Sequence, residues 1–339
     1  MISSVSSSAL QSSDPAPAAS NQNEQDSFLS FNLTAAIAEA ETFCAEFAAT
    51  MQIGANGVTA VTQPKWARQM VHRRGVVDAV IDKIGSNSFA KRRPKETADY
   101  NAYVKKRYEA GEALLFRIPV GPVKNMIRHS GPQMPDIAEY LMFVQLARFA
   151  AAIAPLYPHG VKIQIVPDDV RARAANLCPD DYVASYIGGL RRLVDAMTFS
   201  EWLQVEDGQM RLCDLYKVAR YREAAETKLL DWKANEPESF TSRWEAALEN
   251  ARKNFPVEQS DDSEAEIAAS AWRYMVAHQS EILSGMWSPV DAFPMVYANH
   301  PNCYQLFSMG AKKTKLPWQI SLPVDLLDAA QVPACLQSL

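Results

Sequence analysis

The chain has 339 residues, of which 48% are hydrophobic and 22% charged, with a net charge of −5 from 34 basic and 39 acidic residues. This composition excludes a wholly disordered, collagen-like or coiled-coil chain, and no apolar run approaches the roughly 20 residues of a membrane span. The acidic balance argues against binding through nucleic-acid phosphates, so we expect neither nucleic acid nor membrane as a partner. Five scattered cysteines without a CxxC pair favour reduced thiols in a cytoplasmic protein and no metal site.

The N-terminal 28 residues are rich in Ser, Ala, Pro, Gln and Asn. Such a segment cannot bury enough apolar surface to offset the entropy of folding, so it predicts a disordered tail. It has neither the basic start nor the apolar stretch of a secretory signal. A passive tail is the simpler interpretation, and a regulatory or partner-binding arm is the alternative.

Two helices are expected next in the chain. Apolar residues at helical spacing predict an amphipathic helix over 33–51, and a second helix is expected over 65–84. The charged connection KRRPKE, Lys91 to Glu96, follows them, and Pro94 opposes a continuing helix. We interpret its basic residues as a solvated loop, with a phosphate site as the less favoured alternative.

The centre of the chain predicts a βαβ unit. The apolar run Ala113 to Ile118 indicates a buried strand that ends in a Pro/Gly-rich loop. A long helix is expected over 135–153, a second strand over 161–166 and a further helix over 179–197. Because a crossover of this kind joins parallel strands, the expected fold class is α/β, with a Rossmann-like, mostly parallel sheet flanked by helices.

The last third of the chain is helical in composition from 215 to 284, which predicts a large helical insertion or lobe. Trp232, Trp244 and Trp272 recur there and are expected to anchor its core. Short apolar runs over 304–309 and 318–322 predict strands that complete the sheet.

The common motifs for nucleotide binding, zinc proteolysis and serine hydrolysis are absent from the sequence. The distinctive segment is the loop between the first central strand and the long helix. It combines four prolines and two glycines with Lys124, Arg128 and His129. At the carboxyl edge of a parallel sheet and before a helix N-terminus, these groups suit a phosphate. An ordinary surface loop is the alternative.

Two pairs of carboxylates adjoin the same predicted edge. Asp136 and Glu139 lie one turn apart at the start of the long helix, where they stabilise the helix dipole or, beside Lys124, hold a substrate ammonium group. Asp168 and Asp169 end the second strand, either as helix caps or as site residues.

The C-terminal region adds weaker candidates. His300 and Cys303 lie three residues apart and hint at a Cys/His nucleophile arrangement. A lone histidine in a loop is more often structural.

Seven short segments follow one another in a recognisable order. They are Gly121–Asn125, Pro135–Glu139, Tyr157–Gly160, Pro167–Asp169, Asp181–Tyr186, His300–Pro301 and Pro317–Gln319. This order resembles the isocyanide (isonitrile) synthase family, which includes the pyoverdine and dityrosine biosynthesis-type proteins and has the pattern FPxKS, PDxxE, YxPG, SDG, a Tyr-containing helix, HP and PWH. The resemblance is best over 114–193. Departures fall at Gly121, Asn125, Asp169 and Gln319, where the family pattern has Phe, Ser, Gly and His.

The resemblance implies an enzyme that converts the amino group of an amino acid, typically tyrosine or tryptophan, to an isocyanide, with ribulose 5-phosphate as the carbon donor. It implies no metal or organic cofactor, and an iron and 2-oxoglutarate oxygenase as a downstream partner. The departures leave open a divergent member that acts on another amine or sugar phosphate, or a non-catalytic small-molecule-binding relative. The motif order also predicts one catalytic domain over 29–339 that includes the helical lobe.

Site residues are expected from these segments. Catalytic roles are predicted for Lys124, Asp168, His300 and Glu139. Substrate binding is predicted for Asn125, Arg128, His129, Asp136, Asp169, Trp318 and Gln319.

Overall fold

The computed structural model describes residues 33–121, 124, 134–169, 172, 178–206, 220–254, 264–285, 287–297, 302–306 and 332–337. The described residues from Thr34 onwards belong to one compact unit, Thr34–Leu339. The predicted tail lies outside the described residues, so its disorder and the single domain over 29–339 remain predictions.

The described strands form one mixed sheet. They are β1 (Met51–Gly54), β2 (Gly57–Ala60), β3 (Ala90–Arg92), β4 (Leu114–Val120), β5 (Val161–Pro167), β6 (Leu203–Val205), β7 (Phe293–Val296) and β8 (Tyr304–Leu306). Their order is β1-β2-β5-β4-β7-β8-β3, and β6 also pairs with β5. The pairs β6/β5, β5/β4, β4/β7 and β7/β8 are parallel, whereas the edge pairs β1/β2, β2/β5 and β3/β8 are antiparallel. The predicted α/β class with a mostly parallel sheet is confirmed.

The central strands β4 and β5 are in register over their whole length. β4 continues to Val120, past the predicted end at Ile118, and its side chains alternate between buried and half-buried. Pro119 fits within the strand because β7 pairs with β4 only at Phe116 and Arg117. No described ladder partner therefore needs the N–H group that proline lacks.

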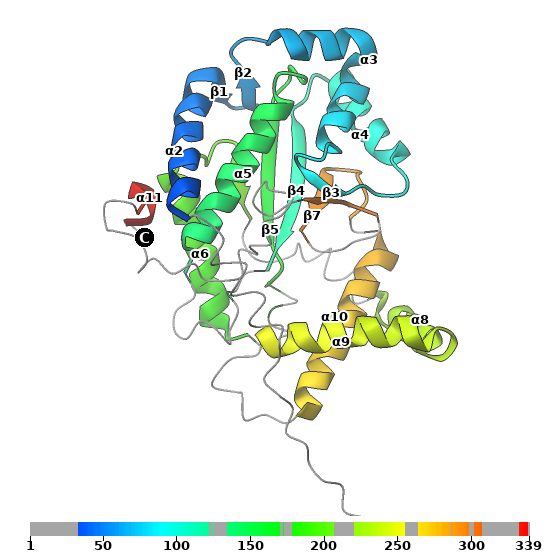
Figure 1. Cartoon of the computed structure of the whole chain (residues 1–339). Coiled ribbons are helices and arrows are strands. Elements are labelled where there is room, and N and C mark those ends of the chain that lie inside the picture. Colours follow the sequence, from blue (N-terminus) through cyan, green and yellow to red (C-terminus); the bar gives the residue numbers. More distant parts are fainter. Residues whose placement is uncertain are drawn as a thin grey trace, which may run out of the picture. The chain divides into compact units, whose positions relative to one another are not determined.

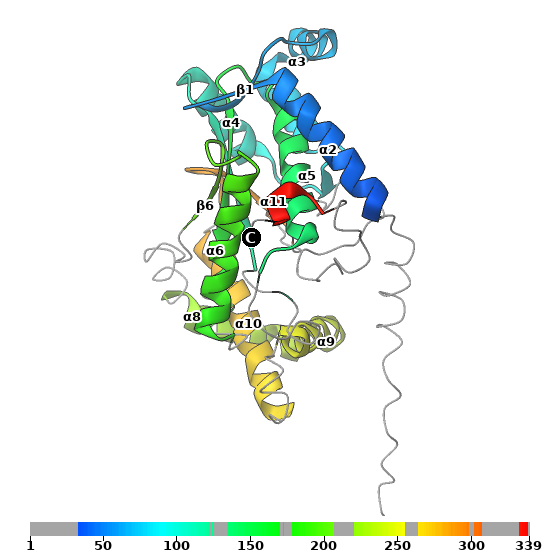
Figure 2. The same cartoon turned by 90° about the vertical axis from the view of Figure 1, so that its left-hand side faces the viewer.

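Helix α5 (Ile137–Ile153) connects the parallel strands β4 and β5, and helix α6 (Asp180–Ala196) connects the parallel strands β5 and β6. α5 lies along β4 and β5 (Figure 1) and is buried on nearly every side. Its Phe149 ring packs 4.9 Å from the ring of Phe116 on β4. On another side, Arg148 pairs with Glu39 of α2 (Leu33–Thr50) at 2.9 Å. Figure 2 shows α11 (Ala334–Gln337) between α2 and α6.

Helix α3 (Lys65–Ile84) spans the predicted range but is bent in its middle. Gly75 at the bend has φ of 77°, in the left-handed region that favours glycine. The following segment KRRPKE is not wholly a loop, because β3 pairs its first residues with β8. α4 (Ala98–Glu109) is additional to the predicted helices, and its Tyr103 hydroxyl donates to the Leu115 carbonyl of β4 at 3.1 Å.

Three helices make up the predicted helical lobe, α8 (Arg222–Asn235), α9 (Pro237–Asn254) and α10 (Glu264–Ser284). They share a buried core, and Trp232, Trp244 and Trp272 pack against it, which confirms their predicted role as anchors. Beyond α10, Trp287 packs with Val296 of β7 and Cys303. The predicted strand over 304–309 is present as β8, whereas 318–322 lie outside the described residues.

No helix among the described residues has the length and apolar composition that a bilayer span requires.

Candidate functional site at the carboxyl ends of β4 and β5

The two central strands end at a common edge, as the βαβ prediction requires. The Asp168 N–H, just after β5, donates to the carbonyl of Val120, the last residue of β4, at 2.8 Å. The chain after β4 supplies Lys124, and α5 begins close by at Asp136. Ligands of parallel sheets bind at this edge.

The start of α5 is fixed by a capping box. Asp136 is the N-cap, and its side chain accepts a hydrogen bond from the Ala138 N–H at 2.8 Å. Glu139 reciprocates, since its Oε2 atom accepts from the Asp136 N–H at 2.7 Å. The local sequence Asp-x-x-Glu therefore satisfies helix N–H groups that would otherwise lack partners, and the helix-stabilising interpretation of these carboxylates is confirmed.

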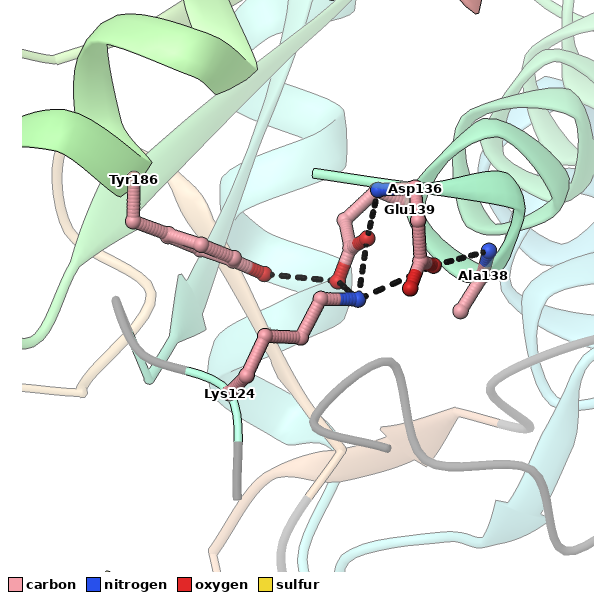
Figure 3. Close-up of polar contacts among 5 residues, drawn as sticks. All are labelled: Lys124, Asp136, Ala138, Glu139 and Tyr186. Carbon is pink, nitrogen blue, oxygen red and sulfur yellow. Dashed lines mark hydrogen bonds and ion pairs between the residues drawn. The ribbon is translucent and has the colours of Figure 1, made fainter. Parts of the chain in front are cut away.

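The same two carboxylates hold a buried lysine (Figure 3). The Lys124 Nζ atom lies 2.6 and 2.5 Å from the two carboxylate oxygens of Glu139 and 3.0 Å from Oδ1 of Asp136. Lys124 and Glu139 have no exposed side-chain surface, and Asp136 is 17% exposed. The expected carboxylate pair beside Lys124 thus exists, but the ammonium group that it binds is that of the protein itself.

A fourth member comes from α6. The Tyr186 hydroxyl donates to Oε1 of Glu139 at 2.8 Å and is fully buried. α6 comes this close because position 189 is glycine: an added Cβ there would lie 2.3 Å from Cδ of Pro135, the residue before the cap. We call Lys124, Asp136, Glu139 and Tyr186 the buried cluster.

Burial sets the protonation behaviour of the buried cluster. It raises the pKa of Glu139 to about 8; Lys124 opposes this shift and Asp136 adds to it. Burial, with Glu139 next, raises the pKa of Tyr186 well above its usual range. A carboxyl group whose pKa is raised in this way is a candidate general acid or base, while Tyr186 stays a hydrogen-bond donor.

Tyr186 was not among the residues predicted to form the site. It lies on the apolar face of α6 with Val183, Ile187 and Leu190, where helical spacing indicates packing. Two signals point to it: the segment Asp181–Tyr186 matches the Tyr-containing helix of the family pattern, and the hydroxyl of a buried tyrosine needs a hydrogen-bond partner.

The carboxylates after β5 are placed at the same edge. Asp169 is 2% exposed, and the Asp168 carbonyl accepts from the Ala172 N–H at 3.1 Å, so the backbone turns directly after the strand. Catalytic or binding roles for Asp168 and Asp169 remain predictions. Six predicted site residues lie outside the described part of the chain: Asn125, Arg128, His129, His300, Trp318 and Gln319.

The structure argues against Cys303 as an activated nucleophile. Its side chain is fully buried, and burial raises its pKa to about 12. A thiol in this environment remains protonated, whereas a reactive cysteine has a lowered pKa. Within the described residues, no group of three or more His, Cys, Asp and Glu side chains is arranged to hold a metal ion.

Comparisons with known proteins show which family and which solved structures this chain is similar to. The family model described as "Pyoverdine/dityrosine biosynthesis protein" matches residues 104–273, half of the chain. This range includes β4, the buried cluster and most of the helical lobe. A comparison with curated protein sequences gave no match.

Among solved structures, the crystal structure of the PvcA protein from Pseudomonas aeruginosa matches with a TM-score of 0.55 and 17% identity, over 72% of this chain and 88% of that one. The two proteins share a fold. A cyclodipeptide synthase from Bacillus thermoamylovorans matches with a TM-score of 0.28 and 10% identity, over 57% of this chain and 79% of that one, which is too low to indicate a shared fold.

Proposed function

Because the chain belongs to the pyoverdine/dityrosine biosynthesis protein family, a family of biosynthetic enzymes, we propose that it is an isonitrile synthase. Its substrates would be an amino acid with a tyrosine- or tryptophan-like side chain and ribulose 5-phosphate, which donates the isocyanide carbon. The observation that supports this proposal most directly is the buried cluster, in which Lys124 binds Glu139 at the ligand-binding edge of the sheet.

The first step of this reaction needs proton transfer in both directions. The substrate ammonium group must lose a proton before its nitrogen attacks the keto carbon of the sugar phosphate. The hydroxyl of the resulting carbinolamine must then gain a proton and leave as water, which yields the imine. A group that binds and releases a proton near neutral pH serves both directions.

Glu139 has the required property, since burial raises its pKa to about 8. In this proposal Glu139 takes the proton from the substrate ammonium group and returns it to the leaving hydroxyl. Lys124 stabilises negative charge on oxygen, and Tyr186 orients the Glu139 carboxyl group through its 2.8 Å hydrogen bond. Asp136 holds Lys124 in place at 3.0 Å.

The remaining predicted residues complete the proposal. Asp168 anchors the amino group of the substrate, Arg128 and His129 bind the phosphate, and His300 acts as a second acid or base. Further substrate contacts are assigned to Asn125, Asp169, Trp318 and Gln319. The isocyanide product would pass to an iron and 2-oxoglutarate oxygenase, no cofactor is required by the enzyme itself, and a cytoplasmic location is predicted.

The test is incubation of the full chain with ribulose 5-phosphate and each amino acid in turn, with the isocyanide product identified by mass. We expect a product with an aromatic amino acid and its loss in Glu139→Gln. The exposed residue Glu238 supplies the matched control, since Glu238→Gln should leave turnover unchanged. Absence of an isocyanide with every amino acid would overturn the proposal.

A second candidate function is favoured by Asp169, a buried carboxylate where the family pattern has glycine. The extra charge beside the edge suits another amine or sugar phosphate, or a binding protein without turnover. Calorimetric titration with amino acids and sugar phosphates separates these cases, because a non-catalytic relative gives binding heat with no change in the ligand.

A further inference from the structure

The bend of α3 borders an open hollow outside the buried cluster. The two arms of the helix meet at Gly75, and the hollow between them has a volume of about 600 Å³. Its lining includes Trp66, Arg73, Arg74, Asp82, Ser86 and Arg93. We call it the α3 elbow. Its volume lies within the range of roughly 300–1,000 Å³ that is typical of small-molecule sites.

The segment that forms the α3 elbow is strongly basic. Residues 65–95 contain nine lysines and arginines and two aspartates, a local charge of +7 in a chain whose net charge is −5. All nine except Lys83 are exposed. The net charge of the whole chain does not reveal this local positive charge, which is a distinctive property of the α3 elbow.

Of the arginines that line the α3 elbow, most form no ion pair with a carboxylate among the described residues. Asp82, the acidic residue among those that line it, pairs with Arg74 across the bend. Arg93 donates its Nε–H to the Gly85 carbonyl at 2.6 Å and forms no ion pair with any described residue. Arg73 likewise has no ion pair within the described part of the chain. Two guanidinium groups are therefore available for an anion.

The α3 elbow also offers an aromatic surface and a hydroxyl group. Trp66 is 43% exposed, an unusual state for so large an apolar side chain, and Lys83 Nζ lies 4.9 Å from its ring centroid. The Ser86 hydroxyl is buried and has no hydrogen-bond partner among the described residues, although a buried hydroxyl normally has one.

We propose that the α3 elbow is a second ligand site, for a small phosphorylated molecule with a planar ring, which is the chemistry of a nucleotide. Guanidinium groups bind phosphate oxygens through paired hydrogen bonds, which assigns Arg73 and Arg93 to the phosphates. An indole stacks on a flat base, which assigns Trp66 to the ring. A concave hollow of this size suits a small ligand better than a nucleic acid or a membrane surface.

The test uses calorimetric titration of the full chain with three probes: ATP, inorganic triphosphate and adenosine. We expect ATP to bind more tightly than either part. The double variant Arg73→Gln/Arg93→Gln should lower the affinity for ATP and for triphosphate by roughly tenfold or more, because charge-assisted hydrogen bonds are lost. Trp66→Ala should lower the affinity for ATP and leave the affinity for triphosphate unchanged.

The matched control is Arg68→Gln/Lys95→Gln, which removes the same charge from exposed positions of the segment that do not line the α3 elbow. It should retain most of the ATP affinity. An equal loss in both double variants would mean unspecific charge attraction and overturn the proposal, as would tighter binding of a single-stranded oligonucleotide than of ATP. Absence of heat with all three probes would overturn it too. Tyr186→Phe should bind ATP normally, so failure of the α3 elbow and failure of the proposed isonitrile synthesis are separable.

Discussion

The buried cluster and the α3 elbow use the same kinds of side chain in opposite ways. In the buried cluster one lysine is shielded from water and held by two carboxylates. In the α3 elbow several arginines are exposed, and one of them is paired, with Asp82. Burial, more than residue type, therefore determines whether a charged side chain is held by partners within the protein or is accessible to a ligand.

Burial has two consequences in the buried cluster. It makes removal of either partner of the ion pair destabilising, because the charge of the remaining partner would be left unpaired in a medium of low polarity. It also moves the pKa of Glu139 into the neutral range. Exposed charges, by contrast, are screened by salt and water and contribute little to stability, which leaves them available for a ligand. The predictions that follow test this contrast.

The largest effect is expected from Lys124→Met, which keeps the length of the side chain and removes its charge. At a pH above the pKa of Glu139, the Glu139 and Asp136 carboxylates then lose their cation, and we expect the free energy of unfolding to fall by about 3–5 kcal/mol. Near neutral pH, where Glu139 is partly protonated, the loss should be smaller. Urea denaturation measures the change. Lys65→Met, at an exposed lysine, should change stability by no more than about 0.5 kcal/mol. Equal effects of the two variants would contradict the burial of Lys124.

The second prediction concerns pH. In the folded chain Glu139 has a pKa of about 8, against 4.5 as its ordinary value. Between these values the folded state holds a proton that the unfolded chain has released, so this group lowers the free energy of unfolding as pH rises from about 4.5 to about 8.

The check is the pH dependence of stability in Glu139→Gln, whose side chain does not titrate. Its curve should lack the decline that the unmodified chain shows in this window. Glu238→Gln, at an exposed carboxylate, should keep the decline. Parallel curves for the unmodified chain and Glu139→Gln would show that Glu139 does not titrate in this range.

Removing the Tyr186 hydroxyl should have a smaller effect. Tyr186→Phe deletes one hydrogen bond to a charged acceptor, which is worth roughly 1.5–3 kcal/mol. A carboxylate that loses a donor also has a higher pKa, so the pH profile of kcat/KM should shift its Glu139-dependent limb upward. Tyr108→Phe, at a hydroxyl with no recorded hydrogen bond among the described residues, should change neither quantity. An unshifted profile would restrict Tyr186 to packing.

Two adjacent glycines of α6 give a matched pair of variants. In Gly189→Ala the new Cβ would lie 2.3 Å from Cδ of Pro135, whereas in Gly188→Ala the nearest atom is Nη1 of the flexible Arg192 side chain, at 3.6 Å. We expect Gly189→Ala to cost about 1–3 kcal/mol through overpacking. Gly188→Ala should gain up to about 1 kcal/mol from helix propensity. Thermal denaturation of the pair measures both, and similar stabilities would show that α6 has room to move away from α5.

The smallest effect is expected at the exposed ion pair of the α3 elbow. Asp82→Asn removes the partner of Arg74, whose side chain is 58% exposed, and should cost less than about 1 kcal/mol. The same variant frees a guanidinium group, so the affinity for ATP should rise. A large loss of stability would make this pair as important as the buried one, and would remove the contrast between the two regions.

The local sequence determined much of the scaffold. The apolar run Ala113 to Ile118 and the strand–helix–strand order that follows it located β4, α5, β5 and α6, and Asp136 with Glu139 encoded the start of α5 through hydrogen bonds within one turn. The motif order led to the family that the comparison over 104–273 supports.

Only the tertiary structure brought distant segments together. Tyr186 reaches Glu139 across 47 positions of sequence, through the close approach of Gly189 to Pro135. The α3 elbow exists because Gly75 bends a helix that is expected from the sequence to be continuous over 65–84. Hydrogen bonding within a turn and apolar spacing are local properties, and a sequence records them directly. The burial of Lys124, the raised pKa of Glu139 and the gathering of charges at the bend depend on which segments pack together. Packing therefore determines which of the many charged residues come together in the candidate site.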